Sequence, residues 1–206
     1  MRSNTIDVRP LGSAVGAEIA GLDLAEPLAP PALATVKGAL AEHGVVFFRD
    51  QSLTETQHIA LARQFGNINV NRFFAHAEGY PEIALGVKEP HQTRNIGGGW
   101  HTDHSYDQIP ALGSMLYARA IPPLGGDTLF ASMRAAYRGL SARMKQHIHG
   151  MEAHHDFKPW RPLFGHSDRA KLRKLEDDFP NPWHPVVRVH PVTGRRVLYV
   201  NRQFCT

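Results

Sequence analysis

The 206-residue chain lacks several features that would assign it to a class at once. It has a single cysteine, Cys205, which excludes a disulfide framework within the chain and a zinc site built from several cysteines. No apolar run reaches the ~20 residues that a membrane-spanning helix needs. The opening MRSNTIDVRP has no apolar stretch of the signal-peptide kind. We therefore expect no membrane partner and a cytoplasmic location.

The excess of positive charge is small and unevenly distributed. Lys and Arg number 23 against 19 Asp and Glu, a formal net charge of +4. Residues 1–103 carry 8 basic and 11 acidic side chains, whereas residues 104–206 carry 15 and 8. A basic half can bind nucleic acid or an anionic small molecule. Here acidic residues interrupt the basic ones, as in Arg169–Asp178, which is typical of a solvated helix face. We therefore expect no nucleic-acid partner.

The composition and the spacing of turn residues indicate the fold class. Hydrophobic residues at 42% and charged residues at 20% are typical of a globular protein. No internal repeat or long linker divides the chain, so we expect one domain over residues 1–206. Short strand candidates separated by Gly and Pro turns predict an α+β protein built around a β-sandwich or jelly roll with flanking helices. The pattern does not favour βαβ winding.

Local signals place the individual elements. Pro30 and Pro31 can begin a helix that Gly44 ends. Thr54 with Gln57 forms a capping box for a helix that runs to Phe65. Further helices are expected from Ser132 to about Leu140 and after Ser141, and strands over Ile6–Leu11, Val45–Phe48, Ile83–Val87, Met115–Ala120 and a hairpin of Val186–Val189 with Val197–Val200.

The sharpest chemical feature is Trp100-His101-Thr102-Asp103-His104, in a chain with 13 histidines. In a strand, residues two apart project to the same face, so His101 and Asp103 can present an imidazole and a carboxylate to one point. With a histidine from elsewhere they would form the facial triad of non-haem Fe(II) oxygenases. The preceding Ile96-Gly97-Gly98-Gly99 would let the backbone approach that metal closely.

Two alternatives to this metal site are open. His101 and Asp103 could hydrogen-bond to each other on a surface strand. A zinc hydrolase could use His101, Asp103 and His104, but it needs all three on one face, and a strand sends His104 to the other. His104 is therefore expected to be structural.

From Val8 onward the chain resembles the taurine dioxygenase branch of the 2-oxoglutarate-dependent Fe(II) dioxygenases, a group that includes the herbicide-degrading aryloxyalkanoate dioxygenases. The resemblance extends over nearly the whole chain in an ordered series of short segments. They are Gly16–Ile19, Gly21–Leu24, Val45–Gln51, Phe65-Gly66, His76–Gly79, Trp100–Asp103, Gly125–Leu129, His155–Phe157, His184–Arg188, His190–Gly194 and Leu198–Asn201 with Phe204.

The resemblance implies roles for individual residues. His101 and Asp103 match two iron ligands, and Thr128 matches the threonine that binds the carboxylate of 2-oxoglutarate. Asn71, Phe74 and Phe204 fall at substrate-pocket positions, where the taurine enzymes have a histidine and a tyrosine at the first two. This departure favours a substrate bulkier and less polar than taurine. The alternatives are that Asn71 is a turn residue and that the two phenylalanines pack in the core.

The implied enzyme is a double-stranded β-helix that uses Fe(2+) and 2-oxoglutarate with dioxygen. It would hydroxylate a small anionic organic substrate of the sulfonate, sulfate ester or aryloxyalkanoate type and release succinate and CO2. No catalytic residue beyond the metal ligands is expected. Both a monomer and a homo-oligomer are compatible with the sequence.

The family's second histidine ligand and its 2-oxoglutarate arginine lie far downstream of the first motif. We expect the chain to lack them together with the C-terminal strands, because His184 and His190 match structural positions. A second hypothesis is therefore a catalytically inactive, truncated fragment of such an enzyme.

Overall fold

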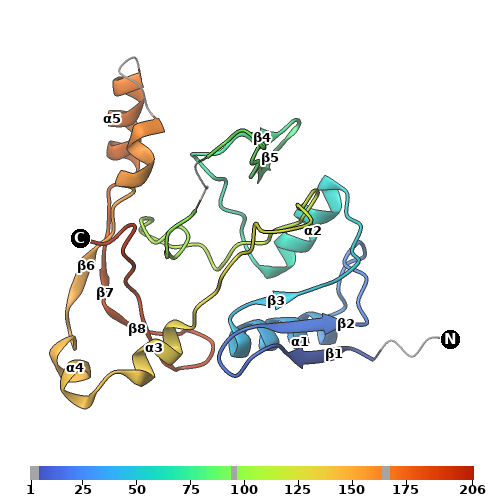
Figure 1. Cartoon of the computed structure of the whole chain (residues 1–206), viewed down its shortest axis with the longest axis horizontal. Helices are drawn as coiled ribbons and strands as arrows, with labels where there is room; N and C mark the ends of the chain where they lie inside the picture. Colours follow the sequence, from blue (N-terminus) through green and yellow to red (C-terminus); the bar gives the residue numbers. More distant parts are fainter. Residues whose placement is uncertain (1–4, 94–96, 164–167) are drawn as a thin grey trace. The chain divides into compact units, whose positions relative to one another are not determined.

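The computed structural model describes residues 5–93, 97–163 and 168–206 (Figure 1). Helices and strands follow one another without regular alternation, which confirms the α+β class. None of the described helices is long and apolar enough to cross a membrane. The elements are β1 (Asp7–Pro10), β2 (Ala17–Ala20), α1 (Pro30–His43), β3 (Val46–Phe47), α2 (Glu55–Phe65), β4 (His76–Ala77), β5 (Tyr80–Ala84), α3 (Met133–Gly139), α4 (Ala142–His147), β6 (Glu152–His154), the 3-10 helix η1 (Lys158–Leu163), α5 (Arg169–Asp178), β7 (Trp183–Pro185), β8 (Val187–Val189) and β9 (Arg196–Leu198).

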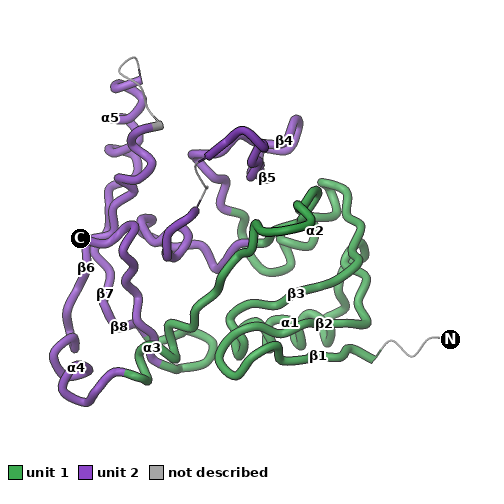
Figure 2. Tube along the Cα trace, viewed as in Figure 1, with its two compact units in different colours: residues 1–68, 115–139, 189–195 green, residues 69–114, 140–188, 196–206 purple. Residues whose placement is uncertain are grey.

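The chain divides into two compact units, which Figure 2 colours separately. Unit 1 comprises residues 1–68, 115–139 and 189–195, and unit 2 comprises residues 69–114, 140–188 and 196–206. Each unit is therefore assembled from segments that are distant in sequence.

Unit 1 is built on a three-stranded sheet and two capped helices. Strand β1 pairs antiparallel with β2, and β2 pairs parallel with β3. Helix α1 begins at Pro30 and ends before Gly44, whose left-handed backbone (φ 75°) lets its N–H donate to the carbonyl of Leu40. Helix α2 has the expected capping box: Thr54 Oγ1 accepts from the Gln57 N–H, and Gln57 Oε1 accepts from the Thr54 N–H. Both predicted helices are confirmed.

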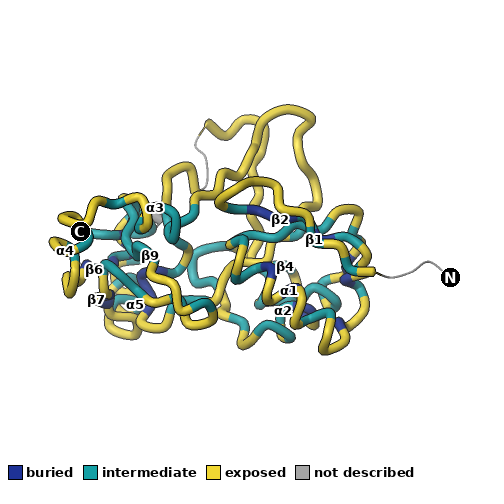
Figure 3. Tube along the Cα trace, turned by 90° about the horizontal axis from the view of Figure 1, so that it is seen from below, coloured by how far each residue is buried: buried dark blue, intermediate teal, exposed yellow. Residues whose placement is uncertain are grey.

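The core of unit 1 lies between the sheet and these helices. Its buried side chains lie on β2, α1, α2 and the segments between them, and the burial colours of Figure 3 trace these stretches. Each buried Val, Leu or Ile side chain contributes roughly 1.5–3 kcal/mol. The buried members are Ile19, Leu24, Leu28, Val36, Ala39, Leu53 and Leu61.

The strand prediction for Met115–Ala120 is wrong, because this segment is irregular and joins none of the sheets of the described residues. A strand needs a neighbouring strand to pair its backbone groups. The segment is held instead through Tyr117, whose hydroxyl accepts from the Leu53 N–H (3.1 Å) and donates to the carbonyl of Gln51 (3.3 Å).

Unit 2 contains the sheet β4–β5, the sheet β6–β7 and most of the hairpin β8–β9. The hairpin confirms the expected pair of strands around the Thr-Gly turn. Strand β5 lies a few residues before the predicted Ile83–Val87. The described strands form one sheet of three strands and three sheets of two. These small sheets do not by themselves make a jelly roll, so that part of the fold stays a prediction.

Candidate metal centre and substrate pocket

The two predicted metal ligands lie together in unit 2. Nε2 of His101 is 3.1 Å from Oδ1 of Asp103. The His101 side chain is 23% exposed and that of Asp103 is 54% exposed, so solutes can reach both groups. An imidazole nitrogen and a carboxylate oxygen therefore converge on one accessible point.

Neighbouring groups fix the orientation of both side chains. His101 Nδ1 donates to the carbonyl of Gly99 (2.7 Å), which leaves Nε2 to face Asp103. A Cβ added to Gly97, which has a φ of 68°, would lie 3.4 Å from Cε1 of His101. The glycine stretch thus approaches the imidazole closely, while Ile96 lies outside the described residues. Ser114 Oγ donates to Oδ2 of Asp103 (2.6 Å), so Oδ1 stays turned toward the histidine.

The pair is electrostatically coupled. The hydrogen bond to Asp103 raises the pKa of His101 against the opposing effect of burial. The hydrogen bond from His101 lowers the pKa of Asp103, and Ser114 adds to that effect. A carboxylate that is ionised at neutral pH is the form that binds a cation.

The geometry fits a divalent metal ion. Ligand atoms at about 2.1–2.2 Å from an octahedral ion lie about 3.0–3.1 Å apart when they are adjacent. The separation of 3.1 Å between Nε2 and Oδ1 matches this spacing. A metal ion would therefore take the place of the proton between the two groups.

The peptide that carries this pair is not a strand, so the strand prediction is wrong here. Asp103 to Tyr106 form turns, in which the Asp107 N–H donates to the carbonyl of His104 (3.0 Å). His104 has a left-handed backbone (φ 53°), which interrupts any extended run. His101 and Asp103 nevertheless meet, because two residues so close in sequence stay within reach in a turn.

His104 has partners other than a metal. Its Nδ1 donates to Oδ2 of Asp107 (2.9 Å), and its Nε2 lies 3.4 Å from Nδ2 of Asn71. Among residues 5–93, 97–163 and 168–206, no three or more His, Cys, Asp or Glu side chains are placed so that they could hold a metal ion. The structure therefore gives His104 a hydrogen-bonding role and does not support the zinc alternative.

Asn71 and Phe74 lie on a tight loop beside this turn. Asn71 Oδ1 accepts from the N–H groups of Phe73 (2.8 Å) and Phe74 (3.0 Å), which is the turn geometry considered as its alternative role. The same side chain presents its Nδ2 to His104, so it links the loop to the metal-bearing turn.

Aromatic rings pack beside this loop and beside His101. The ring of Phe74 packs edge-on against Trp160, with centroids 5.5 Å apart. Phe204 is 1% exposed and packs edge-on against His101, with centroids 5.8 Å apart. The buried cluster around them contains Tyr106 and Phe157. Phe204 thus takes part in the core, whereas Phe74 is only half-buried.

The remaining residues considered from the sequence, Thr128, His184 and His190, are not placed with the His101–Asp103 pair by any described contact. Thr128 lies in unit 1 on an exposed segment, and its 2-oxoglutarate role stays a prediction. His184 is buried and its Nε2 donates to the carbonyl of Asp107 (3.1 Å). His190 Nδ1 accepts from the N–H groups of Val192 and Thr193 in the hairpin turn. Both histidines are therefore engaged in structural hydrogen bonds.

Sequence reasoning missed Ser114 and Asp107. Ser114 lies on an irregular segment with no motif around it. Asp107 lies three residues after His104, and nothing in the sequence distinguishes it from an ordinary surface aspartate. A search for carboxylates within one or two turns of His104 could have found it.

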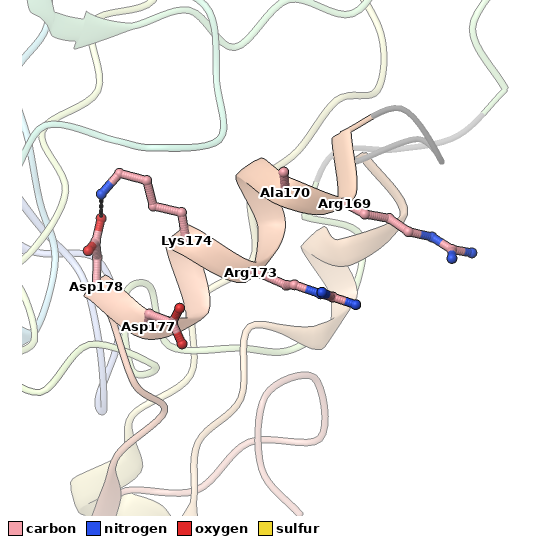
Figure 4. A pocket seen from close by; sticks show the side chains of 6 residues that line it. All are labelled: Arg169, Ala170, Arg173, Lys174, Asp177 and Asp178. Carbon is pink, nitrogen blue, oxygen red and sulfur yellow. Dashed lines mark hydrogen bonds and ion pairs between the residues drawn. The ribbon is translucent and has the colours of Figure 1, made fainter.

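Helix α5 carries a shallow hollow on its surface (Figure 4). Lys174 pairs with Asp178 (2.7 Å), and none of the described side chains of the helix is buried. The hollow is a solvated, charged helix face, which confirms the expectation for this segment. It is lined by Arg169, Ala170, Arg173, Lys174, Asp177 and Asp178.

The comparison with known proteins identifies the class of protein. The family model described as taurine catabolism dioxygenase TauD, TfdA family, matches residues 7–206, and the chain belongs to this family. The chain is 32% identical to the (S)-phenoxypropionate/alpha-ketoglutarate-dioxygenase of Sphingobium herbicidovorans, over 97% of this chain and 72% of that protein.

Two further similarities extend this finding. The alpha-ketoglutarate-dependent sulfate ester dioxygenase of Pseudomonas putida is 30% identical over 94% of this chain and 65% of that protein. The crystal structure of a taurine dioxygenase from Burkholderia xenovorans superposes with a TM-score of 0.77 at 36% identity, over 98% of this chain and 65% of that one. The family and its homologues are dioxygenases that depend on 2-oxoglutarate, also called alpha-ketoglutarate.

Proposed function

We propose that His101 and Asp103 hold Fe(2+) in a 2-oxoglutarate-dependent dioxygenase that hydroxylates a small anionic organic substrate. The observation that carries the proposal is the separation of 3.1 Å between Nε2 and Oδ1, in a chain whose residues 7–206 match the family model. Bound iron would supply the oxidising chemistry: one oxygen atom of O2 goes to succinate and the other to the hydroxylated product, with loss of CO2.

The chain's own residues have holding and orienting roles in this proposal. Gly99 fixes the tautomer of His101, and Ser114 turns Oδ1 of Asp103 toward the imidazole. Thr128 would bind a carboxylate of 2-oxoglutarate through its hydroxyl. The proposal treats residues 1–206 as part of one dioxygenase domain of the jelly-roll type, in the cytoplasm.

The substrate class follows from the loop beside the metal pair. Asn71 offers no charge to a sulfonate, and Phe74 has no hydroxyl where the taurine enzymes have a tyrosine. The half-buried Phe74 and Trp160 instead offer aromatic surface. An aryloxyalkanoate or a long-chain sulfate ester fits this surface better than taurine. The relatives from Sphingobium herbicidovorans and Pseudomonas putida are named for a phenoxypropionate and for sulfate esters.

Metal binding tests the proposal directly. Isothermal titration of the protein with Fe(2+) under anaerobic conditions should show binding that His101→Ala and Asp103→Ala each abolish. The matched control is His149→Ala, since His149 is an exposed histidine of unit 2 outside the site. Equal binding by the wild type and both site variants would overturn the proposal.

Substrate preference is tested without turnover. In an NMR titration of the metal-loaded protein, an aryloxypropionate should shift the indole N–H of Trp160 and the amide of Phe74 at a lower concentration than taurine does. Tighter binding of taurine than of every aryloxy acid and alkyl sulfate would contradict the substrate class and leave the metal proposal standing.

A catalytically inactive chain is the second candidate. The described residues supply two metal-binding side chains and no third one placed with them. Two ligands fix an ion less firmly than three. Succinate formation by the 206-residue protein with Fe(2+), 2-oxoglutarate and ascorbate distinguishes the candidates, because turnover above the metal-free background would reject the inactive one.

A further inference from the structure

Asp107 has no role in the proposed chemistry, yet three side chains donate hydrogen bonds to its carboxylate. Its side chain is 8% exposed. Oδ1 accepts from the guanidinium of Arg72, and Oδ2 accepts from His104 Nδ1 (2.9 Å) and Asn69 Nδ2 (3.2 Å). Its backbone carbonyl also accepts from Nε2 of the buried His184.

These contacts join two segments that are far apart in sequence. Asn69 and Arg72 belong to the loop of residues 69–74, which carries the proposed substrate residues. His104 belongs to the turn that carries the metal pair. The carboxylate of Asp107 therefore ties the substrate loop to the metal turn.

The hydrogen bonds extend through His104 to Asn71. Because a carboxylate only accepts, the Asp107 contact places the proton of His104 on Nδ1. Nε2 is then an acceptor aimed at Nδ2 of Asn71 (3.4 Å). The amide of Asn71 is thereby held with its oxygen toward the N–H groups of Phe73 and Phe74.

We propose that Asp107 is a positioning residue that sets the substrate loop against the metal turn. The inference rests on the proposed function, since it gives Asp107 a place in the assembly of that same site. Asp107 acts through His104 and Asn71 on the loop conformation that presents Phe74, and it contacts neither metal nor substrate.

The negative charge is essential to this role. Burial raises the pKa of Asp107, but the hydrogen bonds from His104 and Arg72 outweigh it and lower the pKa overall. Three donors converge on the carboxylate, so an amide at this position would turn its own N–H groups toward at least one of them. Asp107→Asn should therefore release one side of the link without changing the size of the side chain.

The test follows the loop relative to the metal in the intact chain. Co(2+) bound at His101 and Asp103 produces pseudocontact shifts in the NMR spectrum of the 15N-labelled protein, with the Zn(2+) form as the reference. We expect the shifts of the Phe73 and Phe74 amides to fall by about half in Asp107→Asn, because a loosened loop averages its position. The shift of the Trp100 amide beside His101 should persist.

A matched carboxylate provides the control. Glu18 is 26% exposed and pairs with Arg49 in unit 1 (3.2 Å), so Glu18→Gln removes an ion pair that has no contact with the loop. It should leave the shifts of the Phe73 and Phe74 amides unchanged. If Asp107→Asn does not fold, His104→Phe replaces it, since it cuts the link to Asn71 and keeps the ion pair of Asp107 with Arg72.

The outcomes separate this inference from the proposed function. The role of Asp107 would be overturned if Co(2+) shifts the Trp100 amide and the shifts of the Phe73 and Phe74 amides are unchanged in Asp107→Asn and in His104→Phe. Absence of any Co(2+) shift in the wild type would instead reject the metal site. Hydrogen exchange then still tests Asp107, because the Phe73 and Phe74 amides should exchange about tenfold faster in Asp107→Asn relative to those of α1. Unchanged exchange would overturn the inference.

Discussion

The hydroxyl of Ser114 donates a hydrogen bond of 2.6 Å to Oδ2 of Asp103, eleven positions earlier in the chain. This bond occupies one carboxylate oxygen and leaves the other directed at His101. Partners of this kind orient a ligand and make it a better donor to a metal, although they touch no metal themselves.

Replacement of Ser114 should weaken metal binding without abolishing it. We expect Ser114→Ala to lower the affinity for Fe(2+) about tenfold, the usual effect of losing such a partner. The measurement is anaerobic titration calorimetry, with Ser13→Ala as an exposed serine control. An affinity equal to that of the wild type would show that the carboxylate needs no such orientation.

Replacing His104 tests whether iron binding depends on the proposed ligands and not on the histidine next to Asp103. We expect His104→Ala to retain Fe(2+) binding largely intact, because both ring nitrogens of His104 face partners other than the metal pair. His101→Ala measured in parallel provides the comparison. Equal loss of iron in the two variants would mean that the turn geometry described for His104 is wrong.

Gly38 within α1 and Gly44 directly after it should respond in opposite directions to the same substitution. Gly38 lies inside the helix with nothing within 4 Å of an added Cβ, so Gly38→Ala should stabilise the fold by about 0.5–1 kcal/mol. Gly44 has a φ of 75°, and Gly44→Ala should destabilise it by about 1 kcal/mol. Urea unfolding of both variants measures these changes. A change of the same sign in both would contradict the left-handed backbone assigned to Gly44.

His155 should make stability depend on pH. Burial lowers the pKa of His155 to about 4, with a further contribution from the charge of His184. The unfolded chain binds a proton near pH 6.5, whereas the folded one does so only near pH 4. The neutral form therefore contributes fully above pH 6.5, and stability is lost as the pH falls from 6.5 to 4, by about 3 kcal/mol at most.

The comparison variant is His155→Phe, which keeps a ring in the stack on Tyr199 and cannot titrate. The free energy of unfolding of the wild type should fall more steeply than that of the variant between pH 6.5 and 4.5, as measured by urea unfolding. Parallel profiles would show that His155 is protonated in the folded state as readily as in the unfolded one.

The helices were predictable from the sequence because their signals are local. Pro30 with Gly44, and Thr54 with Gln57, each act within a few residues of the backbone groups that they satisfy. The strand over Met115–Ala120 was not, since strand formation depends on a partner elsewhere in the chain.

The proximity of His101 and Asp103 was predicted for a reason that is only partly right. The spacing of His101 and Asp103 predicted their proximity through a strand, whereas the structure achieves it in a turn. The pairing of Asp107 with Arg72 was beyond sequence reasoning, because it joins positions 35 residues apart and depends on tertiary packing. Local spacing thus predicted that the two side chains meet, but not the groups that orient them.

Phe204, whose ring packs on His101, has a consequence for how the protein folds. Its carbonyl accepts from the N–H of Asp156 (2.7 Å), so the imidazole rests on a ring that is anchored to a third, distant segment. Closing such long loops is slow compared with forming a turn. We therefore expect His101 and Asp103 to meet early in folding, and the ring of Phe204 to reach His101 among the last contacts.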